Sequence, residues 1–171
     1  MKINTSTSIQ LCLLACTFLS TQSITAETAV VVDQPTSPLK IDTYTAEYSP
    51  KDRYSREGIV HKVSLTNTSD QKVVAYKVTF NSFDVFNNDM GRGLGGISVQ
   101  TIDSGQSTSG SWRQSPYAVF SFEKYGTGVA YVSTVRLENG TVWTFNEQEV
   151  LAELKKISQD LTADIFEDGE E

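Results

Sequence analysis

Alternation of apolar and polar residues, repeated in short runs between residues 40 and 145, is the feature that most constrains the fold. Ile59, His61, Val63 and Leu65 occupy every second position of one run, and the run over 73–80 repeats the pattern. Successive side chains of a β-strand point to opposite faces, so a period of two predicts strands with one buried face. Turn-forming residues separate the runs, which is typical of antiparallel sheets.

Further runs predict strands over 97–101, up to Trp112, over 129–137 and over 142–145. Asn139 and Gly140 join the last two runs, and this pair predicts a hairpin turn in which both residues have positive φ. No helical segment lies between the strands, which argues against a parallel α/β fold. The sequence therefore predicts an all-β, immunoglobulin-like antiparallel β-sandwich over residues 40–146.

A change of period after Phe145 predicts one C-terminal amphipathic helix. Val150, Leu154 and Leu161 fall on one face at helical spacing, and Asn146 is placed to cap the first turn. We expect the helix to span residues 147–161. Residues 162–171 are rich in acids and contain no cation, so we expect a disordered tail.

The first 26 residues are expected to be a secretory signal peptide, cleaved after Ala26. A basic Lys2 precedes an apolar stretch over residues 9–19, which is too short to cross a bilayer as a helix. Small polar residues follow, with Ile24 and Ala26 at the −3 and −1 positions. Residues 27–39 contain two prolines and are interpreted as a linker, although the valines at 30–32 could pair as an edge strand.

An alternative signal involves Cys16. The four residues ending at Cys16 resemble a bacterial lipobox, in which the cysteine is lipidated and the protein becomes a membrane-anchored lipoprotein. Phe18 and Leu19 continue the apolar run past the cysteine, which argues against this alternative. Cleavage after Ala26 removes both Cys12 and Cys16, so the mature chain could form no disulfide or zinc-thiolate site.

Charge excludes some partners. Lys plus Arg number 14 against 21 Asp plus Glu, a net charge of −7, so we expect no nucleic-acid binding. We also expect no cofactor and no transmembrane segment in the mature chain. The sequence leaves the oligomeric state open.

Three stretches resemble bacterial secreted immunoglobulin-like domains of the FxLYD type over roughly residues 57–145. They are VSLTNTSDQKVVAYKVTFNSFDVF, IDSGQ and VRLENGTVW. The matching positions are Asn67, Ser69, Phe80, Phe83, Asp84 and Gly105. The insert NNDMGRGLGG after Phe86 and the C-terminal helix depart from the family. The resemblance implies an envelope or extracellular β-sandwich, usually without a catalytic role, and supplies no functional residues.

Aromatic residues provide the best candidate binding surface, because exposed rings offer large contact area to a sugar or peptide. The alternative is that they fill the core. The candidate surface consists of Trp112, Tyr117, Phe120, Phe122 and Tyr125.

Other candidate sites are weaker. We expect His61 to be a hydrogen-bonded core or rim residue, because no second His or Cys accompanies it in the mature chain. The glycines of 91–96 fit G-x-G-x-x-G, but a β-patterned segment follows, so we expect an inter-strand loop. Asp84, Asn87, Asn88 and Asp89 could supply calcium ligands, yet their spacing fails the EF-hand pattern and a capped turn is expected.

These observations predict a secreted or periplasmic, non-enzymatic binding or structural module of the cell envelope, with a protein or glycan as its unknown partner. The alternative is a secreted hydrolase that acts on glycan or cell-wall material through paired carboxylates, such as Asp84 and Glu123. A third possibility is a chaperone or inhibitor that offers an edge strand to a client.

Overall fold

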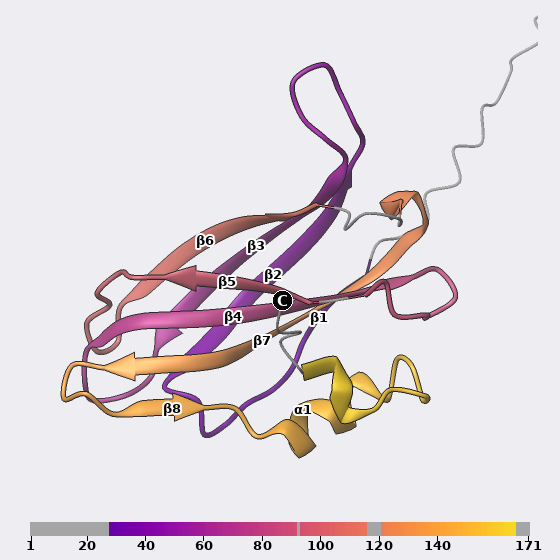
Figure 1. Cartoon of the computed structure of the whole chain (residues 1–171). Coiled ribbons are helices and arrows are strands. Elements are labelled where there is room, and N and C mark those ends of the chain that lie inside the picture. The colour runs from indigo at the N-terminus through magenta and orange to yellow at the C-terminus, as the bar shows by residue number, and fades with distance from the viewer. Residues whose placement is uncertain (1–27, 92, 116–120, 167–171) are drawn as a thin grey trace, which may run out of the picture.

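The protein is a two-sheet β-sandwich with one C-terminal helix, which confirms the predicted fold class. The computed structural model describes residues 28–91, 93–115 and 121–166 (Figure 1). The large sheet has the order β1-β7-β4-β5, with β8 also paired to β7, and the small sheet has the order β2-β3-β6.

The large sheet contains β1 (Thr28–Val31), β4 (Val73–Asp84), β5 (Leu94–Ser98), β7 (Tyr125–Leu137) and β8 (Val142–Thr144). The small sheet contains β2 (Leu39–Ser49), β3 (Gly58–Asn67) and β6 (Ser107–Gln114). The helix is α1 (Glu147–Leu154), and the 3-10 turns are η1 (Phe122–Lys124) and η2 (Ala163–Phe166).

The core lies between the two sheets and consists of the residues that alternate inward. Ile59 and Leu65 of β3 face Val78 and Phe80 of β4, and all four are fully buried. Removing such side chains from water contributes about 2 kcal/mol each. The alternation of the sequence therefore places the core where it was expected.

The segment over 27–39 is not a plain linker, because β1 pairs in parallel with β7. The Val32 amide continues the ladder by donating to the Ala130 carbonyl at 3.0 Å. The Gln34 side chain then takes the place of a peptide group: its Nε2 donates to the Val132 carbonyl, and its Oε1 accepts from the Val132 amide. The edge-strand alternative is confirmed, and the reason is that these bonds, with buried Val32, fix the segment.

Two other local predictions need correction. The strand that we expected over 97–101 is β5, which lies earlier in the chain and ends at Ser98. The hairpin between β7 and β8 is confirmed, but only Gly140 has positive φ, at 89°. The Gly140 amide donates to the Leu137 carbonyl, and the Leu137 amide donates to Thr141. This is a three-residue loop rather than the expected two-residue turn.

The helix is shorter than the predicted 147–161, since α1 ends at Leu154. Turns follow, and they bring Leu161 back onto the large sheet, where it is buried. Continuing the helix for seven more residues would carry the chain about 10 Å further along its axis. The acidic tail, expected to be disordered from residue 162, is structured as far as Phe166. The turn η2 packs Ile165 and Phe166 against the apolar cluster that contains Leu161. Residues 167–171 lie outside the described residues.

Candidate functional site

The outer face of the large sheet, which points away from the small sheet, carries the candidate site. Phe83, Val129 and Tyr131 form an apolar cluster on this face, beneath Val150 and Leu154 of α1. Figure 1 shows the C-terminal segment (residues 145–166) over this part of the sheet, with β4 and β5 extending beyond it. The face is thus partly covered and partly open.

Local sequence explains why the C-terminal segment folds back. The Asn146 side chain accepts hydrogen bonds from the amides of Gln148 and Glu149, which begins α1 directly after Phe145. The buried side chains of Val150 and Leu154 then anchor the helix to the sheet. The chain that follows has to return across the same face.

A cavity of about 200 Å³ lies where the covered and open parts of the face meet. We call it the outer cavity. Three strands and the C-terminal segment contribute its wall, and its lining consists of Lys77, Thr79, Gly93, Gly95, Tyr131, Ser133, Thr134, Phe145, Ile165 and Phe166.

Glycines on and beside β5 let neighbouring side chains lie close to the backbone at the cavity wall. A Cβ at Gly95 would lie 2.5 Å from Cε of Lys77, so the lysine side chain crosses the backbone where a side chain would otherwise stand. A Cβ at Gly93 would lie 3.0 Å from Nδ2 of Asn81. The G-x-G spacing predicted as a loop therefore builds part of a strand and one wall of a cavity, a role that a strand glycine often has.

Three aromatic rings form the opposite wall. The ring centroids of Tyr131 and Phe145 lie 5.2 Å apart, and those of Phe145 and Phe166 also lie 5.2 Å apart. Both contacts have the tilted or edge-to-face geometry that aromatic pairs prefer. Phe145 and Phe166 are half-buried, so part of each ring faces the cavity.

Asn81 lies beside this cavity and has an unusual environment. It is fully buried, follows Thr79 on the outward face of β4, and its two amide atoms have no hydrogen-bond partner among the described residues. A buried, unpaired amide costs about 1–3 kcal/mol, so native proteins rarely keep one without a reason.

The predicted aromatic surface is wrong where the structure describes it. Phe122 and Tyr125 are buried in the core, and Trp112 is half-buried, with its ring close to Gly96 and Gly110. Trp112 of β6 and Tyr125 of β7 pack inward from their strands, and Phe122 packs against the same core from the turn η1. Tyr117 and Phe120 lie outside the described residues.

His61 is a hydrogen-bonded core residue, as expected. Its Nδ1 lies 2.9 Å from the Tyr44 hydroxyl, and its Nε2 lies 3.1 Å from Oε1 of Gln114, which also accepts from Ser82. Since Oε1 can only accept, Nε2–H donates and Nδ1 accepts from Tyr44. Burial lowers the His61 pKa to about 4, and the bond to Gln114 opposes the shift. The imidazole is neutral at pH 7.

Asp84 and Glu123, the predicted carboxylate pair, do line one cleft of about 370 Å³, together with Asn88 and Asp89. The Asp84 carboxylate, however, organises its own loop: it accepts from the amides of Phe86 and Asn88 and from the Asn88 side chain. Burial is the largest influence on the Asp84 pKa and raises it, but these hydrogen bonds and Lys124 outweigh burial and lower the pKa. Among the described residues, no group of three or more His, Cys, Asp or Glu could hold a metal ion.

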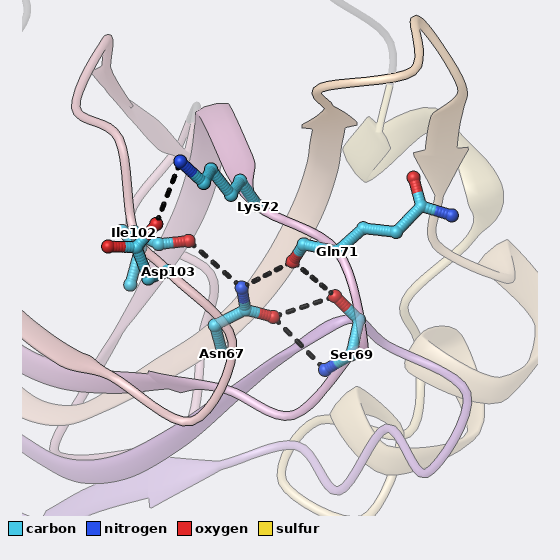
Figure 2. Close-up of polar contacts among 6 residues, drawn as sticks. All are labelled: Asn67, Ser69, Gln71, Lys72, Ile102 and Asp103. Carbon is cyan, nitrogen blue, oxygen red and sulfur yellow. Dashed lines mark hydrogen bonds and ion pairs between the residues drawn. The ribbon is translucent and has the colours of Figure 1, made fainter.

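Asn67, one of the residues in the family resemblance, ties together one end of the sandwich (Figure 2). Its fully buried side chain donates to the carbonyls of Gln71 and Ile102 and accepts from the amide and hydroxyl of Ser69. An ion pair of 3.3 Å between Lys72 and Asp103 closes the same loops on the outside. The position therefore has a structural role.

The signal cleavage site at Ala26 and the lipidation alternative at Cys16 lie outside the described residues. Within the part of the chain that is described, no helix has both the length and the apolar character needed to cross a membrane.

Comparisons with known proteins show the fold and nothing of the function. No protein-family profile and no curated protein matches the chain. A hypothetical protein from Peptoclostridium difficile 630 aligns with 12% identity and a TM-score of 0.50, covering 72% of this chain and 93% of that one. A protein from Bordetella pertussis described as ApaA aligns with 16% identity and a TM-score of 0.40, covering 63% and 85%, which is too loose to argue from.

Sequence reasoning did not identify the outer cavity. Lys77 alternates with apolar neighbours and reads as an ordinary outward strand residue, while Phe166 stands in an acidic stretch without a period. The one available signal was the pair Gly93 and Gly95, since two glycines at a spacing of two can leave one strand face without side chains.

Proposed function

We propose that the protein is a non-enzymatic binding module of the cell envelope, secreted or periplasmic, and that its ligand binds in the outer cavity. The cavity is the observation that carries the proposal. Binding sites place polar groups beside apolar contact surface in a concave lining, and Lys77, Thr79 and the rings of Phe145 and Phe166 provide both kinds of group here. The resemblance to secreted FxLYD-type domains supports the envelope location.

Asn81 adds independent support. Between the sheets, His61, Tyr44 and Gln114 satisfy one another's polar groups. Asn81 has no such partners among the described residues. A polar ligand that reaches past Gly93 would supply them.

The second candidate function is the carboxylate hydrolase, and the shared cleft of Asp84 and Glu123 is the observation in its favour. A catalytic carboxylate needs an oxygen available to substrate or water. Both Asp84 oxygens already accept hydrogen bonds from Asn88, so we rank this candidate second.

A soluble digest of bacterial envelope glycans, titrated into labelled protein, tests both candidates by NMR. The proposal expects shifts of the backbone amides of Lys77, Gly95 and Ser133, and none at Lys62 on the outer face of the small sheet. Shifts confined to Asp84 and Glu123, with new reducing ends among the ligand signals over time, would favour the hydrolase. Binding at neither place would contradict the proposed function.

A further inference from the structure

The free edge of β5 is the least protected edge among the described strands. β5 pairs with β4 on one side, and no described strand pairs with it on the other. Alternate residues of β5 therefore direct backbone N–H and C=O groups away from the sheet, where another strand could bond to them. The stretch over 94–102 contains no charged residue and no proline, the residues that usually block such an edge.

The other described edges carry that protection. β2 has a bulge between Ile41 and Thr43 and charged side chains at Asp42 and Glu47. β6 carries Arg113. β1 and β8, which both pair with β7 at the opposite edge of the large sheet, have only four and three residues. Bulges, charges and short strands all discourage pairing, so an added strand would meet the least resistance at β5.

Apolar side chains are exposed beside this edge. Ile97 of β5 is 67% exposed, and Val99, which follows the strand, is 85% exposed. Ile97 is the register partner of Lys77, and Gly95 is that of Thr79, so both lie on the outer face of the large sheet. The outer face of this edge therefore runs from positions without side chains to exposed aliphatic residues.

This order of residues is self-complementary. An antiparallel copy of β5, related by a two-fold axis at Gly96, would pair the strand along its whole length. Ile97 would then stand opposite Gly95 of the second copy, and continued pairing would set Val99 opposite Gly93. A bulky residue opposite a glycine is the cross-strand arrangement that covers a bare edge position. The two-fold axis makes each of these contacts twice.

We infer that two copies of the protein associate through β5, antiparallel about Gly96, so that their large sheets form one continuous sheet. A second copy fits better than an unrelated extended peptide, because the glycines and aliphatic residues of this edge match those of the same edge reversed. Each copy would bring its Ile97 beside Gly95, which belongs to the wall of the other copy's outer cavity. The inference goes beyond the proposed function, which a monomer could also perform.

The dimer should be weak and should tighten as salt is added. Two short strands bury less than the roughly 1,200–2,000 Å² of stable complexes, so we expect a Kd on the order of 100 µM. The chain has a net charge of −7, so two copies repel each other, whereas the paired edges carry no charge. Salt screens the repulsion without weakening contacts between uncharged groups.

Sedimentation velocity of the expected mature chain, residues 27–171, tests the inference between about 10 µM and about 1 mM. We expect a monomer–dimer equilibrium whose Kd falls as the NaCl concentration rises. Backbone amides of Gly95, Gly96 and Ile97 should shift with protein concentration in NMR spectra.

Ile97→Lys places a charge at the paired edge of both copies and should raise the Kd at least about tenfold. Val142→Lys is the matched control, because Val142 is an exposed aliphatic residue on β8, at the opposite edge of the same sheet. It should dimerise as the unmodified protein does. Amide spectra that superimpose away from the substitutions establish that both variants fold.

A mixture of isotope-labelled and unlabelled protein tests the register. In a filtered NOE spectrum, which records only contacts between copies, we expect contacts from the Ile97 methyl groups to the α-protons of Gly95. Contacts between copies that exclude Gly95 would overturn the register about Gly96.

A monomer at about 1 mM would overturn the inference. A dimer that Ile97→Lys leaves intact, or one that Val142→Lys weakens equally, would overturn the assignment to the β5 edge. The glycan titration of the outer cavity is a separate measurement, so the dimer and the proposed function can fail independently.

Discussion

Buried polar groups behave differently between the two sheets and on the outer face of the large sheet. Between the sheets, His61 of the small sheet is bonded to Tyr44 and to Gln114, and Gln114 also accepts from Ser82 of the large sheet. On the outer face, Asn81 is equally buried and neither amide atom has a partner among the described residues. The inner groups make a complete network that serves the fold. The outer group is not explained by the fold, and we attribute it to a ligand.

The largest expected effect is a difference in stability between substitutions in the core and substitutions on the outer face of the large sheet. Phe80→Ala removes a fully buried ring that stacks on His61 at 4.5 Å, and we expect it to lower the free energy of unfolding by about 4 kcal/mol. Phe145→Ala removes a half-buried cavity wall and should cost only about 1 kcal/mol. Urea unfolding measures both values. Equal losses would mean that the outer cluster supports the fold as much as the core does.

The pH dependence of stability sharpens the comparison. The His61 pKa is lowered from 6.5 to about 4 in the folded protein, so the unfolded chain binds the proton first as pH falls. The contribution of the neutral His61 imidazole to the free energy of unfolding is therefore fully present above pH 6.5. It is lost progressively down to pH 4, and the loss amounts to about 3 kcal/mol. Unfolding of the unmodified protein and of His61→Gln, measured across this pH range, checks the prediction. The variant retains every carboxylate, so the difference between the two curves isolates the contribution of His61. An unchanged slope in His61→Gln would contradict the buried neutral imidazole.

Asn67→Ala tests a buried amide that is fully partnered. Its loss leaves the Ser69 amide without its acceptor and frees the loops in Figure 2, so we expect a loss of about 2 kcal/mol. Asn139→Ala, in an exposed turn, is the control and should cost less than about 1 kcal/mol. Thermal unfolding of the pair would refute this interpretation if the two variants behaved alike.

The smallest expected effect on stability is the most informative about the outer face. Asn81→Leu replaces an unpartnered amide with an apolar group of similar shape, so stability should stay the same or rise by up to about 1 kcal/mol. Binding of the glycan digest should weaken at the same time. A loss of 2 kcal/mol or more would show that the amide does serve the fold.

The sequence pattern predicted the strands whose inward and outward residues alternate regularly. The runs around Ile59 and Val78 gave β3 and β4 because their inward residues are large and regularly spaced. The start of β5 was not predicted, because Gly95 and Gly96 have no side chains and so produce no alternation.

The candidate site depends on distant parts of the chain. Lys77 of β4, Gly95 of β5 and Phe166 of η2 meet only after the sheet has paired and the C-terminal segment has folded back. No local period connects them. The aromatic stretch around Phe122 misled the prediction, since composition alone does not show which face of a strand a ring occupies.

Gly95→Val provides the most direct measurement of the central claim that the outer cavity is the binding site. The nearest atoms to the added Cβ belong to the flexible end of Lys77, and an edge strand accepts valine well, so stability should change by less than about 0.5 kcal/mol. The side chain would fill the cavity and displace the lysine. Saturation-transfer NMR with the glycan digest should lose its signal in Gly95→Val and keep it in Ser111→Val, which alters an exposed position on β6. Full binding by the folded Gly95→Val variant would contradict the account.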